Sequence, residues 1–265
     1  MPLLDAVGHY SVRQAEYLGA LAIQLWRCLR FTIRAHPFGR RRLRWKRVVG
    51  QMAEIGVHSL PVLCLVSGAT GLIMALQGGA ELRKFGAMDA VINLVGTSMT
   101  RELGPLIAAI VVIGRSGSAM SAEVATMAVT EELDALRAMA LDPVDFVLVP
   151  KYLAMLVMLP CLTVMAVFSG ILAGGVFTYY SLDLTLIQYF LRTGDILLMR
   201  DIISGLVKAG IFATVIVHVS CLEGFLVRGG PVSVGRATTN AVVKSIFLVV
   251  LADLISTAFF YFYWR

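Results

Sequence analysis

Long apolar runs separated by short polar stretches dominate the chain. A helix needs about 20 mostly apolar residues to cross the hydrocarbon core of a bilayer. Five runs are candidates for such helices, at residues 55–77, 90–114, 152–180, 202–222 and 245–264. The second contains the charged pair Arg101-Glu102, and the third can span either with a tilt or with a break at Pro160. The pattern predicts an all-α integral membrane protein with five transmembrane helices.

A different pattern occupies residues 11–34, ahead of the first apolar run. Leucines recur there at three- and four-residue spacing, as Leu18, Leu21, Leu25 and Leu29. Such spacing is typical of an amphipathic helix. Trp26 and Phe31 suit the level of the lipid head groups, so we expect an N-terminal interfacial amphipathic helix. A soluble helix packed on a partner is the alternative.

Basic residues indicate how the chain is oriented. The densest group precedes the first run and consists of Arg40, Arg41, Arg42, Arg44, Lys46 and Arg47. Because cytoplasmic loops carry an excess of Lys and Arg, this group places the N-terminus in the cytoplasm. Five crossings then place the C-terminus on the periplasmic side and the loops at 115–151 and 223–244 in the cytoplasm. The loops near 78–89 and 181–201 become external. We divide the chain into a cytoplasmic or interfacial region, 1–48, and a transmembrane domain, 49–265.

Composition supports the membrane assignment. The 265 residues are 58% hydrophobic and only 15% charged, and the mean hydropathy is +0.81. A soluble domain is about 25% charged, so these values argue against a soluble enzyme, a nucleic-acid-binding protein or a disordered chain. The net charge of +6 is explained by the positive-inside bias and by attraction to anionic lipids. The four cysteines form no CxxC pair, so we expect neither a disulfide framework nor a zinc site.

Four charged residues lie inside the predicted spans, and their signs balance. They are Arg101, Glu102, Lys208 and Asp253. A lone charge in the bilayer centre costs on the order of several kcal/mol, so it normally faces a cavity or a partner. One interpretation is an ion-pair network that holds helices together; the other is a polar lining for an anionic head group or a conformational switch. His58 and His218 are more readily explained as packing residues.

A short amphipathic helix is predicted between the second and third spans, at about 130–141. Thr130 is a candidate N-cap, and Glu131 and Glu132 suit the positive end of the helix dipole. Leu133, Leu136 and Met139 or Ala140 form an apolar face, and Asp142-Pro143 would end the helix. An amphipathic helix in this position suits a groove on a partner protein.

The sequence contains no motif for catalysis. The glycines near residue 114 are not followed by the Gly-Lys-Ser/Thr of a phosphate-binding loop, and no HExxH occurs. We therefore expect a transport subunit rather than an enzyme. The alternative from another functional class is an ion-coupled secondary transporter that uses Glu102, Lys208, Asp253 and the histidines. No inverted repeat that would support it is evident.

An ordered set of polar motifs resembles the MlaE (YrbE) permease family. The matching segments are Arg101-Glu102-Leu103-Gly104-Pro105, Gly114-Arg115-Ser116-Gly117-Ser118-Ala119, Ala122-Glu123, Thr130-Glu131-Glu132-Leu133-Asp134-Ala135-Leu136 and Asp142-Pro143, with Leu76-Gln77-Gly78 and Arg236-Ala237-Thr238-Thr239 as further matches. The resemblance covers roughly residues 10–265.

The resemblance implies the transmembrane permease of an ABC transporter in the inner membrane of a Gram-negative bacterium. Such a permease moves phospholipid between the inner and outer membranes and so maintains outer-membrane lipid asymmetry. The implied assembly is a permease homodimer with an ABC ATPase (MlaF-like), a STAS-domain protein (MlaB-like) and a hexameric periplasmic MCE protein (MlaD-like), without nucleic acid. No cofactor is implied in this chain, since the partner ATPase binds the ATP.

The resemblance also implies roles for particular residues. The helix at 130–141 becomes a cytoplasmic coupling helix that docks on the ATPase, through Glu131, Glu132, Leu133, Leu136 and Arg137. Phospholipid would bind in a cavity at the dimer interface. Its lining would combine the apolar residues Met74, Leu82 and Phe85 with Arg101, Glu102, Lys208 and Asp253. The family commonly has a tyrosine where this chain has Phe85, so a hydroxyl is missing there.

Overall fold

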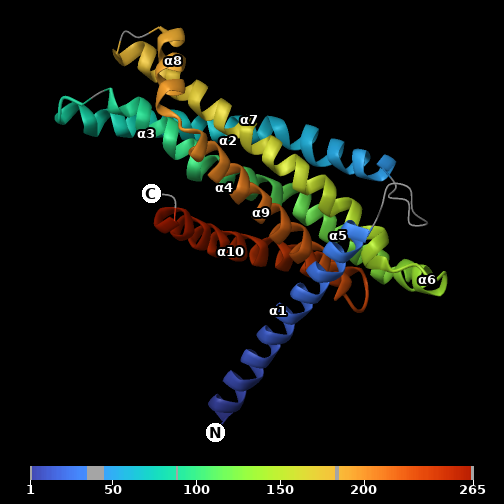
Figure 1. Cartoon of the computed structure of the whole chain (residues 1–265). Coiled ribbons are helices and arrows are strands. Elements are labelled where there is room, and N and C mark those ends of the chain that lie inside the picture. Colours follow the sequence, from blue (N-terminus) through green and yellow to red (C-terminus); the bar gives the residue numbers. More distant parts are fainter. Residues whose placement is uncertain (1, 35–44, 88, 183–184, 264–265) are drawn as a thin grey trace.

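In the computed structural model the chain is a bundle of long helices with one helix projecting from it (Figure 1). The structure describes residues 2–34, 45–87, 89–182 and 185–263, and all regular structure within them is helical. The α-helices are α1 (Pro2–Arg34), α2 (Trp45–Lys84), α3 (Ala90–Ser98), α4 (Gly104–Val112), α5 (Ser118–Val129), α6 (Glu132–Ala138), α7 (Val149–Leu182), α8 (Leu186–Ile196), α9 (Met199–Phe225) and α10 (Pro231–Tyr263). Three π-helical turns accompany them, η1 (Met99–Leu103), η2 (Ile113–Gly117) and η3 (Val144–Leu148).

Five stretches among the described residues are long and apolar enough to cross a membrane. They are α2, the composite helix Ala90–Val129, the helix Val144–Ser181, α9 and α10. The prediction of five transmembrane helices is confirmed. The basic residues Arg40, Arg41, Arg42 and Arg44, on which the predicted orientation depends, lie outside the described residues, so that orientation stays a prediction.

Several predicted boundaries are wrong. The second span does not end at Gly114 but continues through η2 and α5 to Val129. Apart from Arg115 and Met120, the residues from 114 to 122 are Gly, Ser or Ala, and α5 packs against α9 and α10. The predicted loop 115–151 is therefore reduced to the segment around α6. The predicted loop 223–244 is largely helical as well, because α9 extends to Phe225 and α10 begins at Pro231.

The third span passes Pro160 without a break, since α7 is one continuous helix. A proline removes one backbone donor and leaves a carbonyl without its usual partner. Membrane helices tolerate this where neighbouring groups satisfy the freed carbonyl. Of the two alternatives left open by the sequence, the structure supports the unbroken helix.

The α2–α7 pair is the most extensive helix contact in the bundle. The backbones approach so closely that a Cβ at Gly71 would lie 2.1 Å from the Gly170 carbonyl oxygen. Close to this point the Ser67 and Ser169 hydroxyls hydrogen-bond each other across the two helices. Small residues at such contacts are the usual means of association where lipid removes the hydrophobic driving force.

The bundle has two ends, which we name after the short helices there. The α6 end holds the start of α2, α7 and α10, and the α8 end holds α3 and the end of α2 (Figure 1). Helix α8 lies in a region predicted only as a loop. Its Thr185 and Gln188 form a reciprocal capping box, and its Tyr189 is buried against α7, where Gly175 leaves room for the ring.

Helix α1 leaves the bundle at the α6 end and extends away from it (Figure 1). It is a long helix, as predicted, and it contacts α7, α9 and η3. Its inner face carries the buried Gln24 and Cys28. Leu18, Trp26 and Leu29 remain exposed, which leaves apolar side chains free to enter a membrane interface.

A three-residue contact fixes α1 to the bundle. The Lys244 ammonium of α10 pairs with Glu223 of α9 at 2.7 Å, and it lies 4.1 Å from the ring centre of Tyr17 of α1. Such a cation over an aromatic ring is attracted by the ring quadrupole. Burial, and secondarily the nearby Glu223, raises the pKa of the Tyr17 hydroxyl, so this hydroxyl stays protonated at physiological pH.

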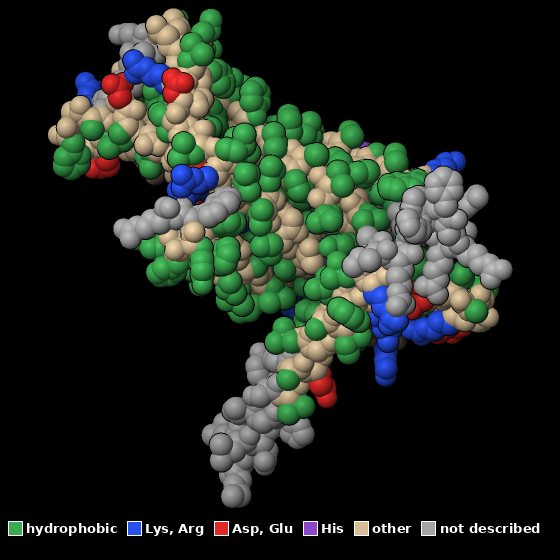
Figure 2. All heavy atoms as spheres, in the orientation of Figure 1, with side chains coloured by type: hydrophobic (Ala, Val, Ile, Leu, Met, Phe, Trp, Pro, Cys, Tyr) green, Lys and Arg blue, Asp and Glu red, His purple; other side chains and the backbone are tan. Residues whose placement is uncertain are grey.

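The exterior of the bundle is apolar along its length. Figure 2 shows hydrophobic side chains over the flanks, with most charged side chains gathered towards the two ends. Exposed examples include Val57 and Leu65 of α2 and Phe247 and Leu254 of α10. A soluble protein rarely presents an apolar surface of this extent, whereas such a surface suits lipid acyl chains.

The α2–α7 contact yields a test. Gly71→Ala is expected to destabilise the protein by about 1–3 kcal/mol, as overpacking a dense core does, because the new Cβ has no room beside the Gly170 carbonyl. The measurement is the apparent melting temperature in detergent. Gly68→Ala is the matched control, since its Cβ would come no closer than 3.7 Å to a neighbour. Equal melting temperatures for the two variants would contradict the close approach.

Candidate functional site

Charged residues from three spans meet around Lys208, in the middle of α9. Its side chain is only 1% exposed. Its ammonium contacts Glu102 Oε2 of η1 and lies 3.0 Å from Asp253 Oδ1 of α10. It also donates a 2.7 Å hydrogen bond to Thr257 Oγ1. We call Glu102, Lys208 and Asp253 the central charge cluster.

Local backbone structure brings Glu102 to this position. Residues Met99–Leu103 form the π-helical turn η1, and such turns occur mostly as single insertions within α-helices, frequently at functional sites. Helix α9 packs tightly against this turn, since a Cβ at Gly205 would lie 2.4 Å from the Thr100 carbonyl oxygen. Glycine at position 205 therefore allows the contact between Glu102 and Lys208.

The energetics of the cluster depend on complete pairing. Moving an ammonium from water into a protein interior costs on the order of several kcal/mol, which only close carboxylates and further hydrogen bonds offset. Lys208 has two carboxylates and one hydroxyl around it. Its charge is thus neutralised inside the protein.

Arg101 belongs to a different pair. Its Nε lies 3.3 Å from Asp201 Oδ1, at the start of α9. The other carboxylate oxygen of Asp201 accepts a hydrogen bond from the Leu198 backbone N–H at 3.2 Å. The four charges that the sequence singled out are therefore not one network: three form the cluster, and the fourth is held beside it by Asp201.

Both groups open on one pocket of about 290 Å³. Its lining consists of Thr97, Ser98, Arg101, Glu102, Ser204, Lys208, Thr257, Phe260 and Tyr261. The Arg101 side chain is 49% exposed, so part of its guanidinium is available to a bound group. A planar guanidinium is well matched to phosphate and carboxylate oxygens. The pocket can thus hold an anionic group beside Arg101 while Lys208 stays paired.

The predicted apolar lipid contacts do not line this pocket. Met74 and Leu82 of α2 are partly buried and pack against the smaller of the two hydrophobic clusters, which includes Val91, Val95 and Tyr189. Phe85 follows the last residue of α2 and is 80% exposed. These three residues lie towards the α8 end, and only Phe85 is fully open to the surroundings.

The helix between the second and third spans is present, but its apolar face is turned inward. Leu133 and Leu136 of α6 are 4% and 6% exposed and belong to the larger hydrophobic cluster of this chain. They therefore cannot be the face offered to a partner, as the resemblance implied. All other residues from 131 to 141 are exposed, and the larger side chains among them are Glu131, Glu132, Asp134, Arg137, Met139 and Leu141.

The predicted ends of this helix are also wrong. Thr130 caps the preceding helix, and its hydroxyl donates to the Thr126 carbonyl oxygen at 3.0 Å. Glu131 takes a left-handed conformation with φ of 61°, and α6 ends at Ala138 before a second left-handed residue, Ala140. Asp142 does not end α6: its carboxylate accepts from the Val144 N–H at 2.9 Å and so begins the next helix.

His218 is a packing residue, as the sequence suggested. It is buried in α9, its Nδ1 lies 2.7 Å from the Thr214 carbonyl oxygen, and its ring meets Tyr152 edge to face. His58 is exposed on α2. Neither histidine lines the pocket beside the central charge cluster, so the two do not form a proton path with it.

Two partners in the site were missed by sequence reasoning. Thr257 lies one helical turn after Asp253, and that spacing was a usable signal because it places both residues on one face. Asp201 was assigned to an external loop, since it precedes the fourth apolar run. An ion pair at the α6 end, between the buried Lys151 and the half-exposed Glu123, had no signal in the hydrophobic pattern.

The fold and site define a polytopic α-helical membrane protein with paired charges in its interior. The family model described as Permease MlaE matches residues 48–259. The chain belongs to the MlaE permease family.

Similar sequences align with most of the chain. A Rickettsia felis protein named as a probable ABC transporter permease protein is 34% identical over 259 residues, which cover 98% of each chain. The intermembrane phospholipid transport system permease protein MlaE of Haemophilus influenzae is 31% identical over 80% of this chain and 81% of its own length. The chloroplastic protein TRIGALACTOSYLDIACYLGLYCEROL 1 of Arabidopsis thaliana is 32% identical over 83% of this chain and 63% of its own length.

The pairing around Lys208 can be tested by removing the cation. Lys208→Met is expected to destabilise the protein by about 3–5 kcal/mol, the usual cost of breaking a buried pair, and by the lower part of that range because Glu102 is partly exposed. The readout is the apparent melting temperature in detergent. Lys84→Met, which removes an exposed pair with Glu81, is the control and should change stability little. A Lys208→Met protein as stable as the control would contradict the pairing.

Proposed function

We propose that this protein is the permease subunit of an ABC transporter that moves phospholipid between two membranes. A separate subunit would hydrolyse the ATP. The observation that carries the proposal is the small charged pocket inside a lipid-exposed bundle, with a half-exposed arginine at its opening. Membership of the MlaE family and the printed name of the Haemophilus influenzae relative support the substrate class.

Within this proposal the two cations have different roles. Arg101 contacts the phosphate of a lipid head group, because its guanidinium is partly free and can form charge-assisted hydrogen bonds. Lys208 is already neutralised by Glu102 and Asp253, so it holds η1, α9 and α10 together. The acyl chains lie against the apolar exterior, and Phe85 is the one exposed member of the predicted apolar set.

The proposed assembly follows the family. Two copies of the permease form a homodimer in the inner membrane, with an ABC ATPase and a STAS-domain protein on the cytoplasmic side and a hexameric MCE protein on the periplasmic side. The N-terminus is cytoplasmic and the C-terminus periplasmic, so the α6 end faces the ATPase. The role of such a complex is the maintenance of outer-membrane lipid asymmetry.

The proposal is tested by lipid transfer in proteoliposomes that contain the whole complex. Wild-type protein should transfer labelled phospholipid only with ATP. Arg101→Ala should reduce transfer by about 10- to 100-fold, because one hydrogen bond to a charged group contributes about 1.5–3 kcal/mol. Arg101→Lys should lose less, since it keeps the charge. Transfer driven by a proton gradient without ATP would contradict the proposal and favour an ion-coupled transporter.

The coupling role of α6 has its own test. The double variant Met139→Asp, Leu141→Asp should fold normally and lose ATPase binding, because both side chains are exposed. Leu133→Asp should instead reduce the yield of folded protein, because it places a carboxylate in the core. The measurements are co-purification of the ATPase and the elution volume in detergent. ATPase binding that survives the exposed double variant would show that the apolar pair Met139 and Leu141, just after α6, is not the contact.

A further inference from the structure

A second buried lysine lies at the α6 end of the bundle. It is at the start of α7 and does not belong to the central charge cluster, whose lysine is on α9. Lys151 is in the first turn of α7, and its side chain is 3% exposed. An apolar side chain of similar volume is often as stable or more stable in such a place, because a buried ammonium must be paired to offset its desolvation. The lysine is therefore better explained by the specific side-chain contacts that it makes than by stability.

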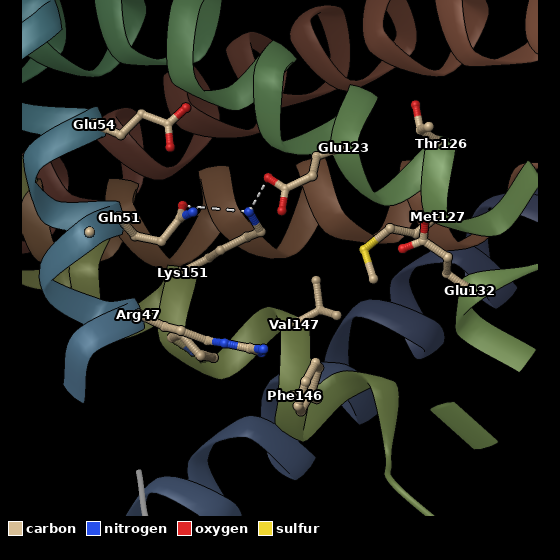
Figure 3. A pocket seen from close by; sticks show the side chains of 12 residues that line it. Arg47, Gln51, Glu54, Glu123, Thr126, Met127, Glu132, Phe146, Val147 and Lys151 are labelled. Atoms are coloured by element: carbon tan, nitrogen blue, oxygen red, sulfur yellow. Dashed lines mark hydrogen bonds and ion pairs between the residues drawn. The ribbon is translucent and has the colours of Figure 1, made fainter. Parts of the chain in front are cut away.

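The Lys151 ammonium joins three helices (Figure 3). It donates a hydrogen bond of 2.5 Å to Glu123 Oε2 of α5, and it lies 3.5 Å from Gln51 Oε1 of α2. Helix α6 is connected to the bundle by α5 on one side and by η3 and α7 on the other. One side chain thus ties both supports of α6 to each other and reaches α2.

A cavity of about 870 Å³ lies beside this connection. Figure 3 shows Lys151 and Glu123 meeting in it, with Gln51 on one side and Glu132 of α6 on the other. Glu123 is 53% exposed, so its carboxylate faces the cavity, while the ammonium comes from a buried stem. Residues of α2, α5, α6, η3 and α7 line this cavity.

The path from this point into the membrane is direct. Helix α7 packs against α2 more extensively than any other pair of helices does, and the two backbones touch at Gly71 and Gly170. Gln51 belongs to α2, so a displacement of the start of α7 is passed to α2 both through this side chain and through the packed backbones. Without the ammonium, α5 and α7 would lose their charged contact at the base of α6, and α6 could shift without taking α2 along.

We propose that Lys151 is a positioning residue that couples movement of α6 to the transmembrane bundle. By holding Glu123 and reaching Gln51, it makes α5, α7 and α2 respond as one unit when α6 is displaced. The inference rests on the proposed function, because the displacement of α6 comes from the ATPase. It goes beyond that function by assigning the transmission step to a buried residue that does not line the pocket beside Arg101.

The test compares ATP hydrolysis with phospholipid transfer in proteoliposomes that contain the complete complex. Lys151→Met should assemble and hydrolyse ATP near the wild-type rate, but transfer lipid about 5- to 100-fold more slowly, the range of a typical coupling between two sites. Lys151→Arg, which keeps the cation, should retain most of the transfer. The charge-swapped double variant Glu123→Lys, Lys151→Glu should recover transfer relative to Lys151→Met. Lys84→Met is the matched control for losing a lysine from an exposed pair.

The outcomes separate the two proposals. A Lys151→Met complex that transfers as much lipid per ATP as wild type overturns the positioning role. So does a parallel loss of assembly, hydrolysis and transfer that the charge swap fails to restore, since that pattern indicates stability alone. If the wild-type complex itself shows no ATP-dependent transfer, the proposed function fails, and the positioning role that rests on it fails with it.

Discussion

Pairing of buried charge is the constraint on which the arrangement of the bundle depends. Lys208 is almost completely buried, so α10 must supply Asp253 and η1 must supply Glu102 within contact distance. These requirements fix three spans relative to one another more tightly than apolar packing does, because lipid solvates an apolar side chain as well as a neighbouring helix does. Lys151 imposes the same requirement on α5 and α2 at the α6 end. Together, the two lysines and the residues that they contact belong to all five spans.

Arg101 and Lys208 have different proposed roles because their side chains differ in exposure. Lys208 is enclosed by its carboxylates, whereas Arg101 keeps half of its side chain open beside the same pocket. A cation that must hold helices together cannot also release and rebind a ligand without leaving carboxylates unpaired. Separating the two tasks between neighbouring residues lets a head group enter and leave the pocket while the contacts among η1, α9 and α10 persist.

The sequence was sufficient for the spans and insufficient for the contacts. Runs of apolar residues identify the five crossings because the thickness of the bilayer sets a minimum length. The ends were misplaced where small polar residues, such as Ser116 and Ser118, continue a helix that is buried against other helices rather than exposed to lipid. The four intramembrane charges were recognised because a charge in the bilayer is unfavourable in free energy. Their pairing was not predicted, because periodicity within one helix does not show which residue of another helix lies opposite. For the same reason Leu133 and Leu136 were recognised as an apolar face, while the surface that the face covers was not identified.

The π-helical turn η1 has a consequence for the register of the second span. One extra residue in a turn rotates everything that follows by about 100° relative to an unbroken α-helix. The segments before and after Arg101-Glu102 therefore obey separate helical phases, and η2 adds a second offset before α5. A single helical wheel drawn through Ala90–Val129 would place lipid-facing positions among buried ones. The composite helix consists of three α-helical segments, α3, α4 and α5, each rotated by a fixed angle relative to the one before. The number of residues in η1, as much as their identity, determines that Glu102 faces Lys208.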